Sequence, residues 1–110
     1  MNKKRVYSHH CQEAAQLLGH LIQAARKEKQ MTTIELAERT GISRGTLHKI
    51  EQGSLTCELG IVFEVAMIVG VQLFDMEPNS LQAAATRTQN QLTLLPQRVR
   101  RTRGDFYDDF

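Results

Sequence analysis

The chain has 110 residues, a formal net charge of +2 at pH 7 and only 5% aromatic residues. This length allows one domain, or one small domain with a tail, and the core must be built mainly from aliphatic side chains. No apolar run is long enough to cross a bilayer, and no signal-peptide stretch follows the basic N-terminus. We therefore expect a cytoplasmic protein that makes no contact with a membrane.

Residue types that support catalysis or metal binding are not clustered. Cys11 and Cys57 are far apart in the sequence and predict neither a metal site nor a disulfide. His9 and His10 could bind a stray metal ion, but a frayed N-terminus is the better interpretation. With no phosphate-binding loop and no catalytic triad, we expect no enzymatic activity and no cofactor. A chain of this size also has little room for a small-molecule pocket.

Charge is distributed unevenly along the chain. Residues 1–52 contain nine Lys or Arg and five acids, whereas residues 53–86 contain four acids and no Lys or Arg. This division suggests one face for a polyanion and another face turned away from it. An ordinary solvated surface would explain the same charges, so charge alone does not decide between the two.

The first patterned segment, residues 11–29, places its apolar residues on one face and predicts an amphipathic helix. Thr32 then offers an N-cap, and Glu35 closes a capping box with it. The two residues predict a short helix over residues 33–40, which Gly41 ends.

A second short helix is expected directly after this turn. Ser43 is its N-cap candidate, the helix runs from Arg44 to about Gln52, and Gly53 stops it. The short connection predicts that the two helices pack against each other.

Two more helices are expected further along the chain. Thr56 can cap a helix over residues 57–69, which Gly70 ends. A last helix starts at Asn79 or Ser80 and continues toward residue 88 or beyond. The whole pattern is all-α, with four to five helices.

Residues 33–52 have the pattern of a helix-turn-helix motif. Apolar residues stand where two helices would cross, Ala37 is small enough for close packing, and Gly41 favours the positive backbone angle of the turn. The apolar positions are Leu36, Ile42, Leu47 and Ile50.

From Leu17 to Met76 the chain resembles the lambda-repressor and Cro family of helix-turn-helix domains. The resemblance is carried by Leu18-Gly19, Ile22, Arg26, Glu35-Leu36-Ala37-Glu38, Gly41-Ile42-Ser43, Ile50-Glu51-Gln52-Gly53 and Val69-Gly70-Val71. It implies a compact DNA-binding domain whose second motif helix enters the major groove of double-stranded DNA. It also implies that a dimer reads the two halves of a palindromic operator.

The resemblance implies which residues contact DNA. Arg44 and Lys49 match base-reading positions, with Thr46 nearby, because Arg can donate to two guanine atoms and Lys can supply one strong donor. Thr33 and Ser43 match positions that hold phosphates. In the family, a longer glutamine often stands at the position of Thr33, so this contact is expected to be weak or absent.

Two further positions on the second motif helix have open roles. Gly45 stands where a side chain often reads a base, so one base contact is expected to be missing. Glycine there also lowers helix propensity by roughly 1 kcal/mol. His48 could contact a phosphate or simply lie on the exposed face.

The resemblance also suggests contacts within and between chains. It pairs Arg26 with Glu51, where the first helix meets the end of the second motif helix. The resemblance also implies a homodimer. A domain this small cannot bury all of the apolar residues in its C-terminal part, so some of them are expected to form the dimer interface, although they could instead complete the monomer core. The interface candidates are Val71, Leu73, Phe74 and Leu81.

We expect four segments: a flexible basic N-terminus (1–10), the helix-turn-helix DNA-binding domain (11–78), a possible dimerisation segment (79–95) and a disordered tail (96–110). The third segment is a helix that could end in a short strand at Leu92–Leu95. The tail is basic and then acidic.

This tail makes the chain similar to the HipB-like antitoxins, which repress their own operon and hold a HipA-like kinase toxin inactive. The candidates for partner binding are Arg98, Arg100, Arg101, Phe106, Tyr107 and Phe110. A stand-alone repressor with a disordered tail is the alternative, and a protein-binding adaptor that does not bind DNA is a third possibility.

Overall fold

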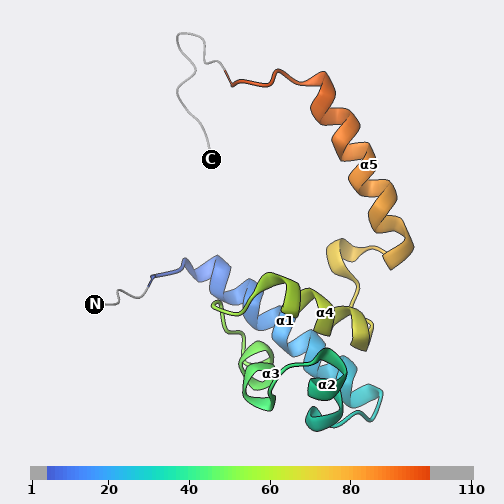
Figure 1. The fold of residues 1–110 in the computed structure, drawn as a ribbon. Coiled ribbons are helices and arrows are strands. Elements are labelled where there is room, and N and C mark those ends of the chain that lie inside the picture. The colour runs from blue at the N-terminus through green and yellow to red at the C-terminus, as the bar shows by residue number, and fades with distance from the viewer. Residues whose placement is uncertain (1–4, 100–110) are drawn as a thin grey trace. The chain divides into compact units, whose positions relative to one another are not determined.

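The computed structural model describes residues 5–99 of the chain (Figure 1). Within these residues all regular structure is helical, which confirms the expected all-α fold. The elements are α1 (His9–Glu28), α2 (Thr33–Thr40), α3 (Arg44–Glu51), α4 (Leu59–Val69), a short 3-10 helix η1 (Leu73–Asp75) and α5 (Pro78–Leu94). The chain divides after Met76 into two compact units.

The first unit encloses an aliphatic core. α1 packs against α3 and α4, and α2 packs against the same two helices. All four helices contribute at least one fully buried side chain, so each is held by the hydrophobic face that it turns inward. The largest of these side chains are Ile22, Leu36, Leu47, Val65 and Val69.

Side-chain caps mark the starts of α2 and α3. The Thr32 hydroxyl accepts the Glu35 N–H at 3.0 Å, and the Glu35 carboxylate accepts the Thr32 N–H at 2.8 Å, which confirms the capping box. Gly41 ends α2 with φ 75°, in the left-handed region that favours glycine. Ser43 then caps α3, because its hydroxyl accepts the Thr46 N–H at 3.0 Å. These local hydrogen bonds fix where both helices begin.

The predicted start of α4 is wrong by two residues. The helix begins at Leu59, after Glu58, rather than at Cys57. The N-cap position is Glu58, and the Thr56 hydroxyl instead lies 3.1 Å from the Ser54 hydroxyl, whose oxygen also accepts the Thr56 N–H at 3.2 Å within the preceding loop. The polar residue that looked like a cap therefore belongs to a local turn.

The short strand expected at Leu92–Leu95 is also wrong. α5 starts at Pro78, where a missing N–H costs no helical hydrogen bond, and continues through Leu94. Residues 5–99 contain no strand with which this segment could pair. Its backbone groups are therefore satisfied within the helix.

At the other end of the chain, α1 begins earlier than expected. The Ser8 hydroxyl accepts the Cys11 N–H at 3.2 Å and caps the helix. His9 and His10 thus lie in its first turn rather than in a frayed end. No three potential metal ligands are grouped among the described residues, and no helix there is long and apolar enough to cross a membrane.

Candidate nucleic-acid interface

α3 approaches α1 closely at its C-terminal end. A Cβ atom added to Gly19 of α1 would lie 2.7 Å from the carbonyl oxygens of both Ile50 and Glu51. Only glycine therefore fits at this position without moving one of the two helices. The close contact fixes the distance of α3 from the scaffold on which it is presented.

A buried ion pair fixes the same end of α3. Arg26 Nε donates to Glu51 Oε2 at 2.8 Å, and Arg26 Nη2 donates to Oε1 at 3.1 Å. The remaining guanidinium nitrogen, Nη1, donates to the carbonyl oxygen of Met31 at 3.0 Å. Arg26 is 8% exposed and Glu51 is 4% exposed. The structure thus brings together the two residues that the resemblance pairs, in a bidentate geometry that also holds the turn after α1.

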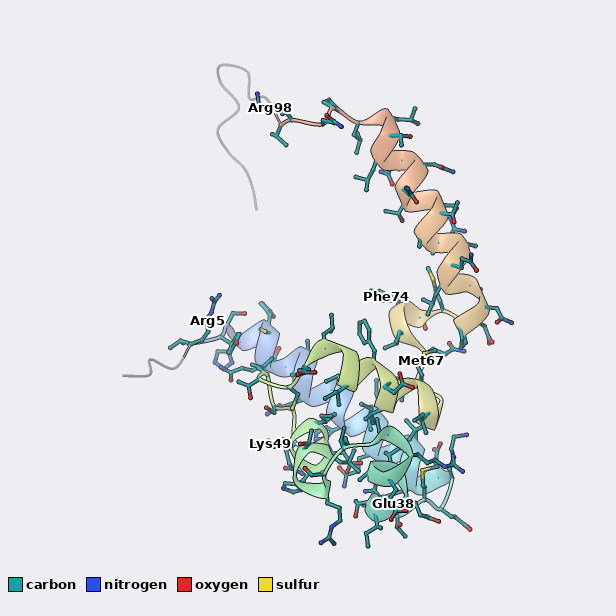
Figure 2. The ribbon with its side chains drawn as sticks, viewed as in Figure 1. Arg5, Glu38, Lys49, Met67, Phe74 and Arg98 are labelled. Carbon is teal, nitrogen blue, oxygen red and sulfur yellow. The ribbon has the colours of Figure 1, made fainter. Side chains whose placement is uncertain are left out.

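The outward face of α3 is cationic. Arg44, His48 and Lys49 are exposed, while Leu47 and Ile50 point into the core. Figure 2 labels Lys49 on this helix. The acid of α3, Glu51, is buried and paired, so it does not offset the charge of the exposed side chains. This face suits a polyanion.

The expected phosphate contacts lie at the N-terminal ends of the two motif helices. Thr33 is the first residue of α2 and is exposed. Ser43 precedes α3, where its hydroxyl also donates to Thr46 Oγ1 at 3.0 Å. Helix N-terminal ends carry partial positive charge that attracts phosphate. Thr46 is half-buried and held by this network, so it is less accessible than Arg44.

The capping box also changes the acidity of one carboxyl group. Hydrogen bonds from the backbone N–H and the side chain of Thr32 lower the pKa of Glu35, with a smaller contribution from the charge of Arg39. Glu35 thus stays ionised at the start of α2, where a negative charge interacts favourably with the helix dipole.

α4 presents a different outward face. Leu59, Phe63 and Met67 are spaced four residues apart along one side of the helix, and Leu59 and Met67 are 66% and 41% exposed. Phe74 of η1 contacts Phe63 edge to face, with ring centroids 6.4 Å apart, and remains 73% exposed beside α4 (Figure 2). We call these four residues the α4 surface. Glu64 is the charged residue of this helix.

The structure separates the four dimer-interface candidates. Val71 and Leu73 pack against the core of the first unit, as the monomer-core alternative expects. Phe74 is exposed, with φ 56°, an unusual backbone conformation for a bulky residue. Leu81 is half-buried within the second unit, where α5 contains no fully buried residue. Phe74 and Leu81 are therefore the candidates that the core does not use.

The partner-binding candidates fall mostly outside the described residues. Arg98 is exposed. The other five, Arg100, Arg101, Phe106, Tyr107 and Phe110, lie beyond residue 99.

Sequence reasoning missed one residue that positions the site. Gly19 appeared only as part of the resemblance, because its contact with the end of α3 joins residues more than thirty positions apart. The signal available from the sequence was a glycine in the middle of an otherwise strong helical pattern.

Sequence comparisons with known proteins also identify a helix-turn-helix domain. Residues 17–73 match a family model described as a helix-turn-helix domain. The chain is 36% identical over 56 residues to the immunity repressor protein of Bacillus phage phi105. The match covers 51% of this chain and 39% of that protein, so the chain spans about two fifths of its relative. No solved structure matches.

Proposed function

The chain belongs to the helix-turn-helix family of the lambda-repressor type, and we propose that it represses transcription by binding a specific operator in double-stranded DNA. One observation carries this proposal. α3 presents Arg44, His48 and Lys49 outward, and its single acid is buried against Arg26. A cationic helix of this kind, on a rigid support, fits the major groove.

Each side chain has a distinct role in the proposed complex. Arg44 reads a guanine through two parallel hydrogen bonds, and Lys49 donates one hydrogen bond to a base edge. Thr33 and Ser43 contact phosphates at the two helix N-terminal ends. His48 contacts phosphate from the same face as Arg44.

Selection from a pool of random duplexes tests this function. The full chain should enrich one family of sequences. Its affinity for the selected duplex should fall steeply between about 50 and 200 mM salt, because binding releases cations from the DNA phosphates and added salt opposes that release. Equal affinity for all sequences would leave only non-specific binding. No binding at low salt would favour a protein-binding adaptor.

The repressor is proposed to act as a homodimer. One short helix buries too little surface for tight specificity, whereas two copies reading half-sites ~34 Å apart solve the problem by symmetry. Phe74, with the rest of the α4 surface, and Leu81 support this proposal because they are apolar and available. Light scattering should show a dimer at tens of micromolar. A monomer that persists with operator DNA present would contradict it.

A more specific role as an antitoxin is also proposed. The chain would repress its own operon and hold a HipA-like kinase inactive. The support is the composition of residues 98–110, where four Arg are followed by three Asp with Phe106, Tyr107 and Phe110. The acidic, aromatic end would be repelled by DNA but suits a protein pocket. A stand-alone repressor is the alternative.

Deletion of residues 104–110 tests the antitoxin role. Operator affinity should survive the deletion, while binding to a kinase encoded beside this gene should weaken at least tenfold, about 1.4 kcal/mol. Unchanged kinase binding would make the tail a spacer. If no such kinase is encoded there, the stand-alone repressor is favoured.

A further inference from the structure

Gly45 occupies a position where the fold does not require glycine. It is the second residue of α3, and its φ is not positive. A Cβ atom there would meet only the Ser43 hydroxyl oxygen, at 3.8 Å, which is an ordinary van der Waals contact. Glycine inside a helix is less stable than alanine by roughly 0.5–1 kcal/mol. The free protein therefore loses stability by keeping glycine at this position.

Four glycines of the described residues have evident structural reasons, whereas Gly60, like Gly45, has none. Gly19 permits the contact between α1 and α3, and Gly41, Gly53 and Gly70 have positive φ values of 75°, 85° and 89°. Gly45 meets neither condition. What distinguishes Gly45 from Gly60 is its place on the outward face of α3, among exposed cationic side chains.

Gly45 lies on the face of α3 that points away from the core. With ~3.6 residues per turn, Gly45 lies opposite the buried pair Leu47 and Ile50, at the middle of the outward face. Arg44 and Lys49 lie on either side of it. The centre of the cationic face is thus bare backbone, and its flanks carry the long donors.

We propose that Gly45 determines specificity by letting the α3 backbone approach the floor of the major groove. A Cβ atom would project about 1.5 Å toward the bases, one carbon–carbon bond length. Hydrogen bonds to base edges hold only within about 2.7–3.2 Å, so such a displacement would lengthen the Arg44 and Lys49 contacts beyond useful range. Contacts to phosphates, made by flexible side chains at the edge of the complex, would adjust. The proposal rests on the proposed DNA-reading function.

The Gly45→Ala variant of the full chain tests the proposal. Its affinity for the selected operator should fall at least tenfold, while its affinity for random duplex DNA stays within twofold of the wild type. Its thermal unfolding temperature should equal or exceed that of the wild type. Gly60→Ala, at the second position of α4 with nothing within 4 Å of the added Cβ, shows what the same change does to stability alone.

The outcomes distinguish a failure of the proposed role of Gly45 from a failure of the proposed operator binding. A Gly45→Ala variant that binds the operator within twofold of the wild type overturns the role of Gly45 and leaves DNA binding intact. Equal losses on operator and random DNA also overturn it, because Gly45 would then affect general contact rather than base reading. A wild type that selects no operator overturns both.

Discussion

α3 and α4 pack against the same two helices, α1 and α2, but present opposite chemistry outward. In Figure 1 the two helices lie on different sides of α1. The outward face of α3 carries cations, whereas the α4 surface is apolar, and the segment that contains it, residues 53–76, has exposed acids and no Lys or Arg. Those acids are Glu58, Glu64 and Asp75. The inward faces are both aliphatic, so the fold alone does not distinguish a DNA-reading helix from a protein-binding one.

The two helices also differ in how they are fixed. α3 is held by the buried Arg26–Glu51 pair and by its contact with Gly19, in addition to apolar packing. α4 begins without a side-chain cap and relies on apolar packing. Base reading needs donors placed within a few tenths of an ångström, whereas an apolar contact tolerates more variation. The better-fixed helix is the one for which we propose base reading.

The largest expected effect concerns the buried ion pair. Glu51→Ala leaves the Arg26 guanidinium buried without its carboxylate and should lower the free energy of unfolding by roughly 3–5 kcal/mol. Glu64→Ala, the matched change on the exposed side of α4, should stay within about 0.5 kcal/mol of the wild type. Urea unfolding of both variants measures the difference. Similar small losses would mean that α3 is not held by this pair.

The next effect concerns base reading by α3. Arg44→Ala should cost about 1–3 kcal/mol of binding free energy on the selected operator and much less on random duplex DNA. Fluorescence anisotropy with both duplexes at one salt concentration gives the two values. Equal losses would show that Arg44 contacts only phosphates.

Self-association should respond to salt in the opposite direction to DNA binding. Phe74→Ser removes an exposed ring from the α4 surface and should weaken the dimer about tenfold, or ~1.4 kcal/mol. Added salt should strengthen the wild-type dimer, because it screens the repulsion between acids near the two α4 surfaces. Sedimentation equilibrium at two salt concentrations checks both expectations. If salt weakens the dimer, ionic contacts elsewhere hold it together.

The smallest effect is the pH dependence of the capping box at the start of α2. The folded-state pKa of Glu35 is lowered by its hydrogen bonds to Thr32. Its stabilising contribution is therefore complete above the pKa of the unfolded chain and is lost as the pH falls through the lower folded-state pKa. Glu35→Gln should lose part of the acid sensitivity of the unfolding temperature. An unchanged acid limb would mean that the ionised carboxylate adds nothing to the cap.

Signals within a few residues predicted structure best. The Thr32–Glu35 box, Gly41 and Ser43 gave the bounds of α2 and the start of α3 correctly, because each acts on backbone groups close by in the chain. Thr56 failed as a cap because its hydroxyl and its N–H both pair with the Ser54 hydroxyl, within the loop before α4. Local rules work where one hydrogen-bonding choice is available.

Long-range features were harder to predict. Periodicity gave no sign that Gly19 touches the end of α3, and only the family resemblance paired Arg26 with Glu51. Nor could composition tell that Val71 and Leu73 pack against the core while Phe74, one residue later, is exposed. Such outcomes depend on how whole helices meet, which no short segment encodes.

The residues that hold α3 in place, among them the buried Arg26–Glu51 pair, are different from the residues on its exposed face. The outward face of α3 does not belong to the buried core, so a substitution there does not disturb the packing of the helix. Its exposed residues are Arg44, Gly45, His48 and Lys49. If these residues read DNA as proposed, substitutions at a few surface positions could change the operator that is recognised while the chain keeps its fold.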